Sequence, residues 1–86
     1  MQEKRPYPNM LFGRSYNWLH AEVANIQRAL VHKGFGVGSA GIDGKFGKDT
    51  EYAAKRFQEA YKITGSIKKN GEGDGIVGRD TWNLLF

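Results

Sequence analysis

The chain has 86 residues, enough for one small domain, and it has no cysteine, which excludes disulfides and thiolate metal sites. Its 26% charged and 40% apolar residues are typical of a folded globular domain, and a net charge of +4 favours polyanionic partners such as nucleic acid, acidic lipid or an anionic cell wall. No apolar run is long enough to cross a membrane, and the N-terminus lacks the apolar stretch of a signal peptide. We therefore expect either another export route or a domain excised from a larger protein.

Residues 1–19 are predicted to form an extended N-terminal arm that precedes a helical domain at residues 20–86. Pro6 and Pro8 favour extended backbone. The segment is too rich in apolar and aromatic residues for a linker: Tyr7, Leu11, Phe12, Tyr16 and Trp18. We expect the arm to pack on the helices.

Three helices follow, near residues 20–33, 48–62 and 79–85. Each has apolar residues at helical spacing. These are Val23, Ile26 and Leu30 in the first, Ala53, Ala54, Phe57, Ala60 and Tyr61 in the second, and Trp82, Leu84, Leu85 and Phe86 in the third. Gly34 and Gly65 are placed to end the first two helices in the left-handed conformation.

A repeated motif separates the helices. The sequence DGKFGKDT at 43–50 recurs as DGIVGRDT at 74–81, 31 residues later. Such a period marks a repeated supersecondary unit, so the predicted fold is all-α: a small three-helix domain built from two helix–loop repeats. The residue that caps the second helix could be Gly47, Asp49 or Thr50.

Polar residues of the repeat are interpreted as structural. Asp43 and Asp74 are expected to accept hydrogen bonds from amides of their own loops. Gln27 and Gln58 lie on the apolar helix faces, where their side chains would satisfy loop backbone groups.

Catalysis and metal binding find little support in the sequence. No pair of carboxylates forms an evident acid–base couple, and His20 and His32 are too far apart along one helix to act together. Residues 70–81 resemble a calcium loop in spacing, but the twelfth position is Thr81 where a bidentate carboxylate is required. We therefore predict no catalytic residue, no metal and no cofactor.

The motifs together resemble the peptidoglycan-binding domain family of bacterial and phage cell-wall hydrolases. The family pattern is matched over about residues 21–86 by Val23, Ile26-Gln27, Leu30, Gly34-Phe35, Asp43-Gly44-Lys45-Phe46-Gly47, Thr50, Ala54, Phe57-Gln58, Asp74-Gly75-Ile76-Val77-Gly78, Thr81-Trp82 and Leu85. Two departures affect the ligand site: residues 13–23 and the segment TGSIKKNGEG before the second Asp-Gly are both longer than usual.

The resemblance implies a non-catalytic module that binds the glycan or stem peptide of peptidoglycan and targets an attached or partner hydrolase, as in endolysins. It implies a location at the bacterial cell wall and a monomer that binds neither membrane nor nucleic acid. The candidate ligand-binding residues are Phe35, Asp43, Lys45, Phe46, Tyr52 and Arg56. Aromatic rings would stack on sugars, and Lys45 and Arg56 would meet stem-peptide carboxylates. Each could equally be an ordinary surface or core residue.

The alternative function is a small basic helical nucleic-acid-binding domain, which three short helices and a pI near 9.5 allow. Against it, the second helix interleaves its basic residues with Asp49, Glu51 and Glu59. Carboxylates on a recognition helix would repel phosphate.

Overall fold

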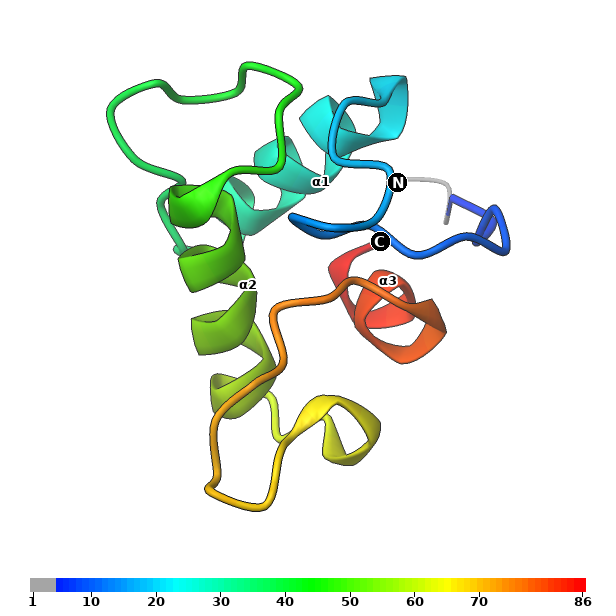
Figure 1. Ribbon diagram of the computed structural model, residues 1–86, viewed down its shortest axis with the longest axis vertical. Coiled ribbons are helices and arrows are strands. Elements are labelled where there is room, and N and C mark those ends of the chain that lie inside the picture. Colours follow the sequence, from blue (N-terminus) through cyan, green and yellow to red (C-terminus); the bar gives the residue numbers. More distant parts are fainter. Residues whose placement is uncertain (1–4) are drawn as a thin grey trace.

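The computed structural model describes residues 5–86 and contains three α-helices and one short 3₁₀ turn in that range (Figure 1). These are α1 (Ala21–His32), α2 (Lys48–Ala60), η1 (Thr64–Ser66) and α3 (Arg79–Leu85). The predicted all-α fold is confirmed. None of the described helices is long and apolar enough to cross a membrane.

Both ends of α1 are defined by local hydrogen bonds. His20 is the N-cap, and its Nδ1 accepts a hydrogen bond from the Glu22 amide at 3.0 Å. At the other end Gly34 adopts φ +93°, and the Phe35 amide donates to the Leu30 carbonyl at 2.9 Å. This is the left-handed ending predicted for Gly34, because only glycine takes that conformation without strain.

The helices α2 and α3 begin in the same way. Gly47 and Gly78 are the N-cap residues, both extended and without a side-chain cap. Thr50 and Thr81, which follow each cap by three residues, are buried and bonded elsewhere. The capping alternatives that the sequence left open are therefore resolved in favour of Gly47.

The end of α2 corrects two predictions. The chain reverses at Lys62, which has φ +52°, and the Ile63 amide donates to the Gln58 carbonyl at 3.1 Å. Lys62 thus occupies the left-handed position expected of Gly65, which instead lies in η1. Tyr61, predicted for the core face, is the C-cap of α2; its ring lies 4.4 Å from that of Phe57 between centres, but the residue is 44% exposed.

One hydrophobic core joins the helices, the loops and the arm. Its buried apolar members are Phe12, Val23, Ile26, Leu30, Val37, Phe46, Ala53, Ala54, Phe57, Ile63, Val77, Trp82 and Leu85. Phe86 is partly buried against this core, whereas Leu84, predicted for the same face of α3, is exposed. In so small a domain, each of these side chains is a large share of the total burial.

The arm crosses between α1 and α3 and bonds to both repeated loops (Figure 1). Phe12 and Val77 exchange two backbone hydrogen bonds, of 3.0 and 2.7 Å. Further along, the Phe46 amide donates to the Trp18 carbonyl at 2.7 Å, and Leu19 lies opposite Lys45 in an antiparallel bridge. Phe46 and Val77 are equivalent positions of the two motifs, so the arm contacts each copy at the same place.

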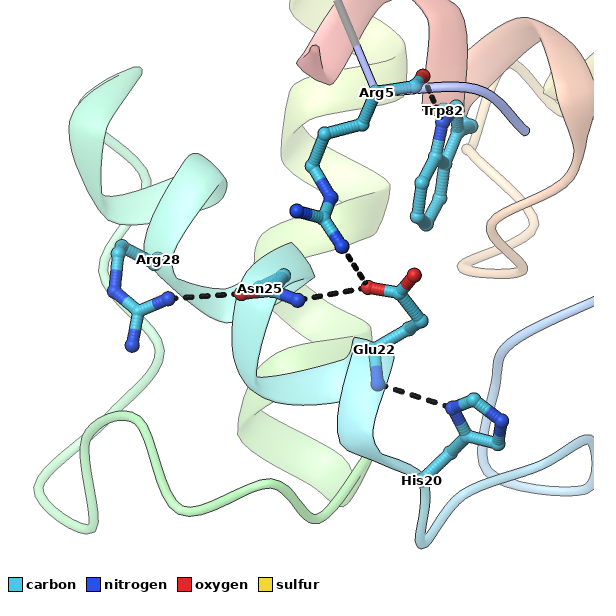
Figure 2. A network of polar contacts seen from close by, with 6 residues as sticks. All are labelled: Arg5, His20, Glu22, Asn25, Arg28 and Trp82. Carbon is cyan, nitrogen blue, oxygen red and sulfur yellow. Dashed lines mark hydrogen bonds and ion pairs between the residues drawn. The ribbon is translucent and has the colours of Figure 1, made fainter. Parts of the chain in front are cut away.

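The start of the arm is fixed by a polar network on α1 and α3 (Figure 2). The Trp82 indole N–H donates to the Arg5 carbonyl at 2.9 Å, and the Arg5 guanidinium pairs with Glu22 at 2.6 Å. Asn25 donates to the same carboxylate at 2.7 Å and accepts a hydrogen bond from Arg28 at 2.9 Å. Residues 5–19 thus pack on the helices as expected, while the first four residues of the predicted arm lie outside the described range.

Candidate functional site

The first repeated loop is organised by the buried side chain of Gln27. Its amide nitrogen lies 3.0 Å from Asp43 Oδ1, 3.0 Å from the Lys45 carbonyl and 2.9 Å from Thr50 Oγ1. Its Oε1 accepts a hydrogen bond from the Gly44 amide at 2.9 Å. Asp43 Oδ1 also accepts from the Lys45 amide at 3.0 Å. One side chain therefore holds both the turn and the start of α2.

The second loop has the same arrangement around Gln58, with every partner 31 positions further along. The amide nitrogen lies 3.1 Å from Asp74 Oδ1, 3.0 Å from the Ile76 carbonyl and 3.1 Å from Thr81 Oγ1. Gly75 donates to Oε1 at 2.9 Å, and Ile76 donates to Asp74 at 2.9 Å. The structural interpretation of the two glutamines and the two aspartates is confirmed.

Asp43 differs from Asp74 in being exposed. The hydrogen bonds from Gln27 and from the Lys45 amide lower the pKa of Asp43 below its usual range. Asp43 is therefore ionised at neutral pH. Within residues 5–86 all of its side-chain hydrogen bonds use Oδ1, so Oδ2 can accept from a donor of a ligand.

Three of the predicted ligand-binding residues meet on one surface. The Arg56 guanidinium carbon lies 5.7 Å from the ring centre of Tyr52 and 6.0 Å from that of Phe35. Phe35 continues to Tyr61, at 6.5 Å between ring centres, and the Lys33 ammonium lies 5.9 Å from the Tyr61 ring. We call these five residues the cation–aromatic row.

The cation–aromatic row is open to solvent and carries uncompensated positive charge. Tyr52 is 61% exposed, and both cations are exposed. Among the described residues, neither Arg56 nor Lys33 forms an ion pair with an acid. Stacking on rings restrains a guanidinium while its N–H edges stay free, and such edges can bind a carboxylate with two parallel hydrogen bonds. The row is therefore suited to an anionic ligand with flat or apolar parts.

The other predicted site residues lie elsewhere. Phe46 is 2% exposed and belongs to the core, so its ring packs inside the domain and is not accessible to a ligand. Lys45 is exposed beside Leu19 of the arm. No hydrogen bond or ring contact within residues 5–86 joins Asp43 or Lys45 to the cation–aromatic row. In the same range no three His, Asp or Glu side chains are grouped to hold a metal ion.

Sequence reasoning missed Lys33 and Tyr61 as members of the row. Tyr61 was assigned to the core because it continues the helical spacing from Phe57. Lys33 could have been considered from the sequence, because it directly precedes the predicted turn at Gly34. This turn brings the Phe35 ring onto Phe57 of α2.

Comparison with known proteins supports the family resemblance that the motifs indicated. The model of the family described as "Putative peptidoglycan binding domain" matches residues 20–66, more than half of the chain. Over 63 residues the chain is 41% identical to the "Type VI secretion system spike protein VgrG3" of Vibrio cholerae serotype O1, a match that covers 70% of this chain. The matched part is 6% of the length of that relative. No solved structure matches the chain. The extent of the family match shows that the chain belongs to the peptidoglycan binding domain family.

Proposed function

We propose that the chain is a non-catalytic module that binds peptidoglycan at the cation–aromatic row and keeps an attached or partner cell-wall hydrolase close to its substrate. Family membership supports peptidoglycan as the ligand, and the geometry of the cation–aromatic row supports this surface as the place of contact. Stem peptides carry carboxylates, and Arg56 and Lys33 are exposed cations without acidic partners in the described chain. The observation that carries the proposal is the Arg56 guanidinium between the rings of Tyr52 and Phe35.

Binding would serve the hydrolase through effective concentration. A module that holds its partner on an insoluble polymer makes each catalytic encounter nearly intramolecular, without any new contact at the active site. The location that follows is the bacterial cell wall. A hydrolase fused to this chain should clear suspended cell-wall sacculi faster than the hydrolase alone, and an equal rate would count against targeting.

Binding itself is tested by sedimentation with insoluble peptidoglycan sacculi at low and high salt, with duplex DNA as a competitor. We expect the protein to pellet at both salt concentrations and DNA not to displace it. Arg56→Gln should weaken binding roughly 10- to 150-fold, because a hydrogen bond to a charged group contributes roughly 1.5–3 kcal/mol. The control is Arg28→Gln, which removes the same charge from an exposed site on α1.

Two results would contradict the proposal. The first is binding that high salt or DNA abolishes, which would reduce the interaction to non-specific charge attraction. The second is an equal loss for Arg56→Gln and Arg28→Gln, which would show that net charge matters and the cation–aromatic row does not.

A further inference from the structure

The helix α1 ends in a Schellman turn that is closed by glycine. The Gly34 amide donates to the Val31 carbonyl at 3.0 Å, and the Phe35 amide donates to the Leu30 carbonyl at 2.9 Å. This pair of hydrogen bonds requires a left-handed residue at the first position beyond the cap, and Gly34 has φ +93° there. Glycine adopts this conformation without strain because it has no Cβ.

The helix α2 ends in the same turn, but a lysine closes it. The Lys62 amide donates to the Glu59 carbonyl at 3.3 Å, and the Ile63 amide donates to the Gln58 carbonyl at 3.1 Å. Lys62 has φ +52°. The left-handed conformation costs a residue with a Cβ more free energy than it costs glycine. The end of α2 therefore carries backbone strain that the end of α1 avoids.

The side chain of Lys62 forms no polar contact within the described chain that would offset this strain. The residue is exposed, and no ion pair, side-chain hydrogen bond or ring contact among residues 5–86 involves its ammonium. Glu59, the acid nearest to it along the chain, accepts a hydrogen bond from the Gly73 amide at 3.0 Å. Attraction to the negative end of the α2 dipole remains, but it is small for an exposed group. Residues with a strained backbone cluster at functional sites.

Lys62 directly follows one end of the cation–aromatic row. Tyr61 is the C-cap of α2, and the Lys33 ammonium lies 5.9 Å from the centre of its ring. Adjacent Cα atoms are about 3.8 Å apart, and a lysine side chain is long and flexible. The Lys62 ammonium can therefore reach a ligand bound at Tyr61. With Lys33 and Arg56 it makes three exposed cations, and none of them forms an ion pair within residues 5–86.

We propose that Lys62 is a further ligand-binding residue, whose ammonium pairs with a carboxylate of the ligand that lies on the cation–aromatic row. The left-handed backbone places this cation just beyond the end of α2, and the domain is less stable for it than it would be with glycine. The inference rests on the proposed function and deepens it, because neither the repeated motifs nor the ring contacts of the row give Lys62 a role.

The test separates the charge of Lys62 from its strain. Lys62→Gln and Lys62→Gly both remove the ammonium, but only Lys62→Gly also removes the left-handed strain, whereas Lys62→Arg keeps both. In sacculi sedimentation we expect the Gln and Gly variants to weaken binding by the same factor, about fivefold, and Lys62→Arg to bind like the wild type. In thermal unfolding Lys62→Gly should melt roughly 4–8 °C above Lys62→Gln. A merely structural role would not lower binding while the melting temperature rises.

The matched control is Lys69→Gln, which removes the same charge from an exposed lysine in the loop between η1 and α3 and should change binding by less than about twofold. An equal loss for Lys69→Gln and Lys62→Gln, or full binding by Lys62→Gln, overturns the inference. A Lys62→Gly variant that melts no higher than Lys62→Gln does so too. These results leave the proposed function standing, whereas wild-type protein that fails to sediment would overturn that function and this inference together.

Discussion

The glutamine networks lead to a quantitative prediction about stability. Methionine is close to glutamine in size but can replace none of its hydrogen bonds, so Gln58→Met and Gln27→Met remove the same interactions from two equivalent sites. The sites differ in access to water. Gly75 is buried, whereas Gly44 is half-buried and Asp43 is exposed. Water can therefore replace the lost bonds more readily at the first loop than at the second.

The size of the effect follows from the groups left without partners. Gln58→Met deprives the buried Gly75 amide and the half-buried Ile76 carbonyl of their hydrogen bonds, while Thr81 keeps Ser66 as a neighbour at 3.2 Å. A buried polar group without a partner costs about 1–3 kcal/mol. We expect a loss of about 2–4 kcal/mol for Gln58→Met and about 1–2 kcal/mol for Gln27→Met.

The assay is urea unfolding followed by the fluorescence of the buried Trp82, with circular dichroism as a second probe. An 86-residue domain has a total stability of roughly 4–13 kcal/mol, so the larger loss would lower the melting temperature by ten degrees or more. The reasoning is refuted if Gln27→Met is as destabilising as Gln58→Met, or if both cost under about 0.5 kcal/mol.

Three further predictions concern the turns, the arm and the candidate site. Gly44 and Gly75 have φ of +78° and +74°, but a Cβ at Gly75 would lie 2.7 Å from a side-chain atom of α2 while one at Gly44 meets nothing within 4 Å. Gly44→Ala should cost about 1 kcal/mol and Gly75→Ala measurably more in the same urea assay, and equal costs would contradict this. Burial raises the pKa of Glu22, but hydrogen bonds from the Asn25 and Arg5 side chains and the nearby positive charges outweigh it and lower the pKa below 4.5. The stability that Glu22 contributes is thus present above pH 4.5 and is lost as the pH falls through the lowered pKa. Glu22→Gln should therefore flatten the acid side of a plot of melting temperature against pH. An unchanged plot would exclude this role. Phe46→Ala should destabilise the fold by about 3–5 kcal/mol, whereas Tyr52→Ala should change stability by under about 0.5 kcal/mol yet weaken sacculi binding; a destabilised Tyr52→Ala with intact binding would reverse the assignment of the two rings.

Much of the helical framework was predictable because its signals are local. The helix α1 was expected near 20–33 and runs over Ala21–His32, and α3 coincides with the predicted 79–85. Gln27 and Gln58 could be assigned a structural role because a polar side chain on an apolar helix face must find partners. These inferences needed only spacing along the chain and the chemistry of one residue type.

Other features depend on contacts between distant parts of the chain and could not be predicted from spacing. Tyr61 continues the pattern of α2, but it is the last residue before the left-handed reversal at Lys62 and is 44% exposed. The cation–aromatic row requires Phe35 to fold back over α2. The place of Trp18 beside the first loop requires the bridge between Leu19 and Lys45, which nothing in the local sequence indicates.

The attachment of the arm to α3 has a consequence for synthesis on the ribosome. Arg5 and Trp82 are joined across 77 positions, and Asn9 and Arg79 across 70. During synthesis the arm therefore leaves the exit tunnel well before α3, and it lacks these partners until α3 has been made. Contacts of such sequence separation slow folding, because the chain must close a long loop before they form. Until then Phe12 lacks Trp82, the ring on which it stacks, so a nascent chain that stalls before α3 exposes more of Phe12 to chaperones and proteases.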